Sequence, residues 1–136
     1  RARVGSIRNP LWRHGGTVFG PHPRDFSYPL PKRIKDLALK SALNDRAVNN
    51  DIVVINALVL ENVKTKTFAG ILKKLKLTDE TLLVLSSFSE NIVLSVRNIP
   101  NIRLVDSRSI NAYNVLSFKK ILITKDALRV VVDRLK

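Results

Sequence analysis

The sequence contains no cysteine and no methionine, and only one of its five glycines, Gly70, lies beyond residue 20. Without cysteine the chain has no disulfides, no thiol chemistry and no cysteine-ligated zinc. A nucleotide site in a parallel α/β sheet needs a glycine-rich turn after a strand, and neither a G-x-G-x-x-G pattern nor a Walker loop is present. The lack of methionine indicates that residue 1 is not the translation start and that a preceding segment is missing from a processed or partial product.

Histidine is also scarce. His14 and His22 are the only two, and both precede every periodic segment, which excludes a Ser-His-Asp set inside a folded core. Two histidines without a third ligand are a poor metal site, and stacking on a base or bonding to phosphate suits them better. Asp106 follows a predicted strand, but a lone carboxylate beside Ser107 and Arg108 is typical of a surface turn. We therefore predict no enzymatic activity, no metal and no cofactor.

Acidic residues are few relative to basic ones. The chain has 11 acids against 24 lysines and arginines, a formal net charge of +13 and an isoelectric point of about 10.7. Residues 1–35 have a formal net charge of +7, and residues 36–136 have a formal net charge of +6. Such a charge predicts a polyanionic partner. No apolar run approaches the ~20 residues that span a bilayer, and no basic amphipathic helix stands alone, so nucleic acid is favoured over a membrane surface.

The first 28 residues differ in composition from the rest of the chain. They contain four of the five glycines, three of the six prolines and half of the eight aromatic residues, with no acid before Asp25. Too few aliphatic residues are present for a core, whereas solvated linkers lack tryptophan and phenylalanine. Arginine forks, aromatic faces and a closely approachable backbone suit a phosphate-lined partner. We predict an extended basic RNA-binding arm over residues 1–28 and a globular domain over residues 29–136.

Residues 29–136 alternate between helical and strand patterns. Apolar, β-branched runs predict strands over residues 52–59, 81–86, 102–105 and 120–123. Apolar residues at helical spacing predict helices over residues 32–48 and about 65–75, and further helices after Ser89, Ser109 and Thr124 as N-caps. This order, with short connections, predicts an α/β fold: a four-stranded parallel sheet wrapped by helices on both faces, a Rossmann-like three-layer arrangement.

Helical spacing also predicts which residues face the core. The expected faces are Ile34, Leu37, Ala38, Ser41 and Ala42, widened by Leu39 and Leu43, in the first helix; Phe68, Ile71, Leu72 and Leu75 in the second; Ala112, Tyr113 and Leu116 in the fourth; and Ala127, Leu128, Val131 and Leu135 in the last.

Three features of the arm and its junction have two interpretations each. Trp12 either folds back into the core or stacks on a base or ribose, and the sparse apolar neighbours favour RNA. Gly15 and Gly16 form either a flexible joint or a close passage of backbone along phosphates. Lys32 and Arg33 crowd the first turn of a helix, where the dipole prefers acids, so this turn is either solvated or faces phosphate.

The arm contains a long and specific pattern. It reads Gly5-Ser6-x-Arg8-x-Pro10-Leu11-Trp12-Arg13-x-Gly15-Gly16, followed by Phe19-Gly20-Pro21-x-Pro23-Arg24-Asp25. This pattern strongly resembles the signature loop of the bacterial-type large-subunit ribosomal protein four family, and Leu30 to Leu43 is similar to the family's next helix. The resemblance covers the whole chain, and its specificity lies in the arm. Asn9 and His14 depart from it, since a small residue and usually glycine is expected at both positions.

The resemblance implies a structural constituent of the large ribosomal subunit. It implies an α/β domain on the outside of the subunit and a long loop threading through rRNA to the wall of the peptide exit tunnel, with neighbouring large-subunit proteins as further partners. Arg1 and Arg3 would lie nearest the tunnel. The family's first strand and helix, and the outgoing half of the loop, are absent from this sequence. The alternative, from another class of function, is a nucleotide-dependent α/β enzyme with a basic tail. The absence of a glycine-rich loop argues against it.

The residues predicted to bind rRNA are cations, aromatic residues, glycines and a few polar residues of the arm, with the first two cations of the following helix. They are Arg1, Arg3, Ser6, Arg8, Trp12, Arg13, His14, Gly15, Gly16, Phe19, Arg24, Lys32 and Arg33. No small-molecule substrate and no membrane are predicted. A slight bias to Asn, Lys and Ile, together with the truncated start, favours a plastid ribosome, with the bacterial cytoplasm as the alternative.

The composition of the arm predicts that it is disordered in the free protein, because it cannot bury enough apolar surface to offset the entropy of ordering it. Limited trypsin digestion without RNA, followed by mass spectrometry, should cut before Tyr28 and leave residues 30–136 intact. An arm cleaved as slowly as the domain would contradict this expectation.

Overall fold

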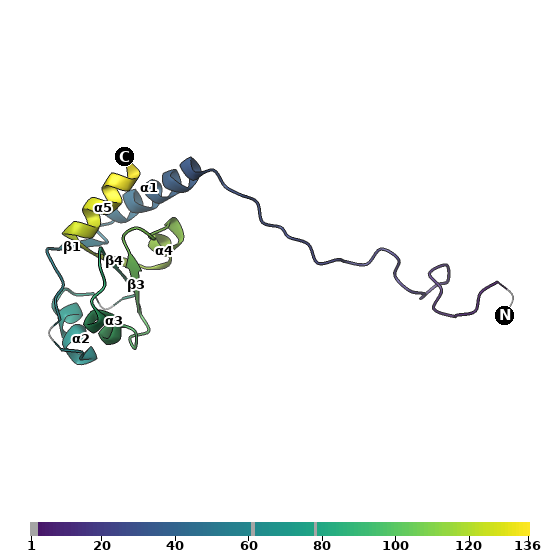
Figure 1. Ribbon diagram of the computed structural model, residues 1–136, viewed down its shortest axis with the longest axis horizontal. Coiled ribbons are helices and arrows are strands. Elements are labelled where there is room, and N and C mark those ends of the chain that lie inside the picture. Colours follow the sequence, from purple (N-terminus) through teal and green to yellow (C-terminus); the bar gives the residue numbers. More distant parts are fainter. Residues whose placement is uncertain (1–2, 61, 78) are drawn as a thin grey trace.

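A computed structural model of the chain describes residues 3–60, 62–77 and 79–136. Its elements follow the order α1 (Lys32–Val48), β1 (Ile52–Ile55), α2 (Thr65–Lys74), β2 (Thr81–Leu85), α3 (Glu90–Val96), β3 (Ile102–Asp106), α4 (Ala112–Ser117), β4 (Lys120–Thr124) and α5 (Lys125–Leu135). Residues 3–31 contain turns but no helix or strand, and Figure 1 shows them leading away from the N-terminal end of α1. The predicted alternation of helices and strands is confirmed.

The four strands form one parallel sheet in the order β1-β4-β2-β3. The central strand β2 is buried along all five residues. Its side chains alternate: Leu82 and Val84 join a core with α1, α4 and α5, whereas Leu83 and Leu85 join a second core with α2 and α3. Since successive residues of a strand point to opposite faces, helices must cover both sides of this sheet. The predicted three-layer α/β fold is confirmed.

Strand β1 is four residues long, where the apolar run predicted eight. It is an edge strand that pairs with β4, from Ile52 opposite Ile121 to Ile55 opposite Thr124. Because β4 gives way to α5 at Lys125, residues 56–59 have no strand beside them to pair with. The other three strands agree with the prediction to within one residue at each end.

Helix α1 spans the predicted residues, but its buried face differs. Leu39 and Ala42 are buried, with Leu43 packed against the same core. Four residues predicted to face the core are exposed: Ile34 (52%), Leu37 (66%), Ala38 and Ser41. A groove of about 410 Å³ separates the first turns of α1 from α4. Helical spacing places residues on one side of a helix, but it does not say which turns reach the sheet.

Helix α4 also turns a different face inward. Asn114 and Val115 are buried, whereas Tyr113 and Leu116, predicted to pack inward, are 71% and 54% exposed. The Arg46 side chain of α1 contacts this helix: its Nε donates to the Val115 carbonyl at 3.3 Å and its Nη2 to the Leu116 carbonyl at 3.1 Å. The predicted faces of α2 and α5 are confirmed by the buried residues Phe68, Leu72, Ala127 and Val131.

None of the three predicted side-chain caps is made. Ser89 and Thr124 occupy N-cap positions, but their side chains accept no capping hydrogen bond. The cap of α4 is Asn111, not Ser109: the Asn111 Oδ1 accepts a backbone N–H of α4 at 2.8 Å. Asparagine caps a helix as well as serine does, so residue type alone does not choose between neighbouring candidates.

Asp51 ties the edge of the sheet to α1. Its Oδ1 accepts a hydrogen bond from Lys120 Nζ at 2.6 Å, and its Oδ2 lies 3.6 Å from Nη1 of Arg46. The hydrogen bond from Lys120 is the main cause that lowers the pKa of Asp51 below its ordinary value of 3.8, although desolvation opposes it. With the Asp51 side chain only 18% exposed, this pair is better shielded from solvent than a surface ion pair.

We expect Asp51→Asn to weaken the pH dependence of stability in acid. Because the folded-state pKa of Asp51 is lowered, its carboxylate contributes stability that is fully present above pH 3.8 and is lost as the pH falls below that value. Denaturant unfolding at a series of pH values should show the free energies of unfolding of wild type and variant converging in acid.

The matched control is Asp133→Asn, which removes an exposed ion pair with Lys136 and should change stability little at any pH. A wild type and Asp51→Asn variant that differ by the same amount at every pH would show that this carboxylate does not act through its ionisation.

Candidate nucleic-acid interface

The arm presents its aromatic rings and its cations to solvent. The exposed fractions of Trp12, Phe19, Phe26 and Tyr28 are 57%, 94%, 75% and 75%. Trp12 joins neither core cluster of the domain. Within residues 3–28 no arginine forms an ion pair. Uncovered rings and unpaired guanidinium groups are what a partner rich in phosphates and bases can engage.

A hydrogen-bonded turn over residues 6–16 gives the arm a defined local shape. The N–H of Gly16 donates to the Arg8 carbonyl at 2.9 Å, and the N–H of Gly15 donates to the Trp12 carbonyl at 3.0 Å. A Cβ on Gly15 would collide with the backbone carbonyl of Asn9, which itself accepts the Trp12 N–H. The turn itself therefore requires glycine at position 15, a role that neither sequence-based interpretation included.

Both departures from the family pattern lie in this turn. His14 has φ of 62°, in the left-handed region, where a residue other than glycine costs roughly 1–2 kcal/mol. This conformation explains why glycine is the usual residue expected there. Asn9 contributes its side chain, since its Oδ1 accepts the Leu11 N–H at 3.0 Å. The two substitutions are therefore compatible with a closed turn.

The acid of the arm does not neutralise its arginines. Asp25 accepts hydrogen bonds from the backbone N–H and the hydroxyl of Ser27, each at 2.8 Å. The backbone bond, followed by the hydroxyl bond, lowers the pKa of Asp25. The neighbouring Arg24 stacks instead on Phe26, with the guanidinium carbon 4.3 Å from the ring centroid.

The structure places the predicted rRNA-binding residues along one continuous stretch. Ser6, Arg8, Trp12, Arg13, His14, Gly15 and Gly16 lie in the turn, Phe19 and Arg24 in the extended part, and Lys32 and Arg33 in the first turn of α1. Arg3 precedes the turn, with φ of 75°, and Arg1 lies outside the described residues. All but Gly15 of the described set are exposed. Their contacts with RNA stay predictions.

The junction with the domain continues the charge of the arm. The first turn of α1 contains no acidic residue, and Lys32, Arg33 and Lys35 are exposed there. This arrangement accommodates either the solvated or the phosphate-facing interpretation.

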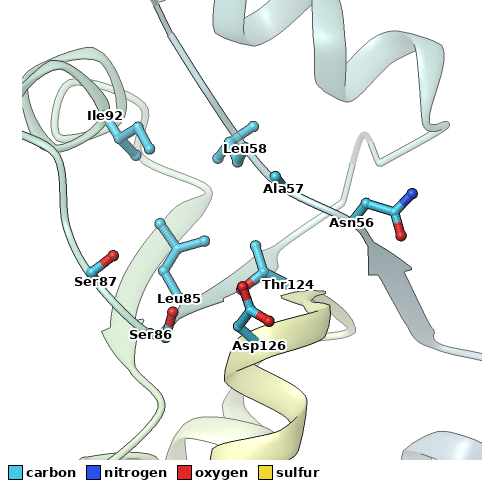
Figure 2. Close-up of a pocket in the computed structure, with 9 residues that line it drawn as sticks. All are labelled: Asn56, Ala57, Leu58, Leu85, Ser86, Ser87, Ile92, Thr124 and Asp126. Carbon is cyan, nitrogen blue, oxygen red and sulfur yellow. The ribbon is translucent and has the colours of Figure 1, made fainter.

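A cavity lies at the carboxyl ends of β1, β2 and β4, where open α/β sheets bind ligands. Figure 2 shows it between Asn56, which follows β1, Ser86 and Ser87, which follow β2, Thr124 at the end of β4 and Asp126 in the first turn of α5. Its volume is about 120 Å³, below the roughly 300–1,000 Å³ of typical ligand pockets. None of its lining residues is a glycine, so no phosphate-cradling loop is formed there.

Asp106 at the end of β3 serves a turn, as predicted. Its Oδ1 accepts hydrogen bonds from the Ser107 hydroxyl at 3.2 Å and the Arg108 N–H at 3.1 Å. In the part of the chain that the structure describes, no group of three or more His, Asp or Glu side chains could hold a metal. None of the helices described combines the length and the apolar character needed to span a bilayer.

The lysines of α2 are not among the residues predicted from the sequence to bind rRNA. Lys66, Lys73 and Lys74 are exposed, whereas Phe68 and Leu72 of the same helix are buried. Their spacing is itself helical, and this was the signal that could have grouped them.

Comparison with known proteins identifies the family. A sequence model of the ribosomal protein L4/L1 family matches residues 1–134. The large ribosomal subunit protein uL4 of Pelotomaculum thermopropionicum is 50% identical over 128 residues, which cover 94% of this chain and 62% of that protein. The corresponding protein of Ruminiclostridium cellulolyticum is 47% identical over 131 residues, which cover 96% and 63%. That of Moorella thermoacetica is 46% identical over 128 residues, which cover 94% and 62%.

These relatives are bacterial, and the chain spans less than two thirds of their length. The bacterial alternative is thereby supported, and the plastid origin that composition favoured is not. Because the family model covers nearly all of the sequence, the chain belongs to the ribosomal protein L4/L1 family.

Proposed function

We propose that the protein is a structural, non-enzymatic constituent of the large ribosomal subunit that binds large-subunit rRNA through its arm. The observation that supports this most directly is the set of exposed arginines without ion pairs in the arm of a ribosomal protein: Arg3, Arg8, Arg13 and Arg24. Neighbouring large-subunit proteins are the further partners that we propose.

Binding by the arm would combine two physical terms. Each arginine that neutralises a phosphate releases condensed counterions, which supplies affinity without reading sequence. Trp12 and Phe19, with exposed rings, would stack on unpaired bases or riboses. The turn over residues 6–16 brings Arg8, Trp12 and Arg13 together on a compact unit, so fewer degrees of freedom are lost when RNA closes around it.

The length of the arm supports a deep path through RNA. A stretch of 28 residues reaches at most about 90–100 Å when fully extended, and Figure 1 shows the arm pointing away from the domain over much of its length. We propose that its N-terminal end approaches the wall of the peptide exit tunnel. The bacterial relatives support a bacterial ribosome as its location.

The alternatives have less support. A nucleotide-dependent enzyme would need a site at the carboxyl edge of the sheet, and the cavity there is small and lacks a glycine loop. A membrane-surface role would need an amphipathic face with apolar residues, which the arm does not form.

We expect the combined change of Arg3, Arg8, Arg13 and Arg24 to Ser to abolish tight rRNA binding and assembly into subunits. If each arginine contacts one phosphate, the slope of log affinity against log salt should become shallower by about 3 to 4. The melting temperature of the domain should hardly change, because these side chains lie outside both cores. Filter binding at several salt concentrations and a thermal melt measure both.

The matched control replaces four exposed cations of the domain, Lys40, Lys119, Lys125 and Arg129, by Ser. It removes the same formal charge and should retain most of the salt dependence. An arm variant that assembles like the wild type would show that the arm is not the rRNA-binding element.

Trp12→Ala separates stacking from packing. Because Trp12 is 57% exposed and joins no core cluster, the melting temperature should stay unchanged. Loss of base stacking should weaken rRNA binding by about 1–3 kcal/mol, measured by the same titration. A lower melting temperature with unchanged affinity would assign Trp12 to packing against the domain.

A further inference from the structure

We propose that the outer face of α2 is a second RNA-binding surface that docks on a sugar–phosphate backbone and is separate from the arm. The α2 surface consists of Lys66, Gly70, Lys73 and Lys74, with Lys76 two residues beyond the end of the helix. The inference rests on the proposed function, since it takes large-subunit rRNA as the partner.

The charge of the domain is concentrated around α2. Residues 62–78 contain five lysines and no acid, whereas the whole of residues 36–136 has a balance of +6. No ion pair involves these lysines among the residues that the structure describes. On α5 and its C-cap, by contrast, Arg129 pairs with Asp126 and Lys136 with Asp133. The five positive charges of residues 62–78 are therefore not neutralised by ion pairs within the described part of the chain.

The members of the α2 surface are neighbours on one side of the helix. Gly70 follows Lys66 by four residues and precedes Lys73 and Lys74 by three and four, and such residues are adjacent on a helix. All three lysines are exposed, whereas Phe68 and Leu72 are buried in the core on this side of the sheet. The lysines therefore surround Gly70 on the face turned away from the core.

Gly70 has no role in the fold that the structure reveals. It lies inside α2, where glycine is a poor helix former, and its φ is not positive. A Cβ added there would meet nothing within 4 Å, so no neighbouring element requires the space. A glycine flanked by exposed lysines permits close approach of an external backbone, as glycines do where phosphates are bound.

The residue types at the two ends of α2 are also not those that would stabilise the helix by itself. Lys66 lies in the first turn, where the helix dipole disfavours a cation and no acid compensates it. Lys76 has φ of 56°, and the N–H of Leu77 donates to the Leu72 carbonyl at 3.0 Å. This is the left-handed position that ends a helix, where glycine is preferred. Binding of a polyanion at this surface would explain why lysine occupies both positions.

The α2 surface and the arm lie on opposite sides of the sheet. The arm leaves from α1, which covers one face with α4 and α5, whereas α2 covers the other face with α3. Figure 1 shows α2 at the end of the domain farthest from the junction with the arm. One RNA segment in contact with the arm's base therefore cannot easily cover α2, and the two surfaces would hold two different segments of rRNA together.

The chemistry of the surface favours an RNA backbone over other polyanions. It contains lysines and a glycine but no aromatic or apolar side chain, so it has nothing to insert into a membrane or to anchor a protein hot spot. Lysine ammonium groups act as point charges toward phosphate and do not read base edges. Binding should therefore position the domain on RNA without sequence preference.

The test titrates the full chain against deproteinised bacterial large-subunit rRNA at several salt concentrations. The triple variant Lys66→Gln, Lys73→Gln and Lys74→Gln should flatten the slope of log affinity against log salt by about 2. The control triple Lys125→Gln, Arg129→Gln and Lys136→Gln removes the same charge from α5 and its C-cap and should change the slope much less. Combined with the arm variant, the α2 changes should add to its effect, because separate contacts are independent.

Two further variants distinguish RNA contact from stability. Gly70→Ala and Lys76→Gly each install the residue that the helix favours, so each should raise the melting temperature. Both should nevertheless weaken rRNA binding, and Gly70→Gln should weaken it further. Variants that are more stable and bind as tightly as the wild type would overturn the proposal.

The outcomes separate this inference from the proposed function. If the arm variant loses rRNA binding and the α2 triple variant binds like the wild type, the α2 surface is not an RNA contact, although the proposed function stands. If the wild-type chain does not bind the rRNA, both are wrong. If the α2 triple variant loses binding to phosphatidylserine vesicles but keeps rRNA affinity, the surface serves a membrane and the inference fails.

Discussion

The burial of β2 and β4 from both sides is the constraint on which the rest of the structure depends. Leu82, Leu83, Val84 and Leu85 are each at most 3% exposed, and they point alternately to the two faces of the sheet. A single layer of helices would leave half of these side chains in water. The second layer is what sets α2 on the side opposite to α1 and the arm. The core therefore determines where the basic surfaces lie relative to one another.

Two groups of cations in this protein have different physical roles. Arg46, Lys120 and Arg134 are partly buried and paired: Arg46 and Lys120 with Asp51, and Arg134 with Asp36. They connect helices and strands within the domain. The arginines of the arm and the lysines of α2 have no acidic partner among the described residues, and a chain with a net charge of +13 repels itself. A polyanion relieves that repulsion, so assembly with RNA also favours the folded chain.

Two glycines, Gly15 and Gly70, differ in whether the fold itself requires a glycine at that position. Gly15 is needed because the turn of the arm closes on the Asn9 carbonyl, whatever the partner. Gly70 has open space where its side chain would be, and the helix around it would be more stable with alanine. From the sequence, Gly15 is interpreted as part of a flexible joint or of a close passage of backbone along phosphates, and Gly70 is given no role. The reason for Gly15 lies within the chain, whereas no described neighbour of Gly70 requires a glycine there.

The sequence alone determined the order of helices and strands, the three layers and the family, since these depend on local periodicity, short connections and a long specific motif. It also marked the arm as unable to form a core. Tertiary structure decided what local pattern cannot express. The partner strand set the end of β1 at Ile55, and the burial of Asn114 and Val115 left Tyr113 and Leu116 exposed. Contact with the sheet chose Leu39 over Ile34, and the second helix layer placed the lysines of α2 opposite to the arm. Each of these outcomes depends on residues far apart in the chain that meet only in the fold.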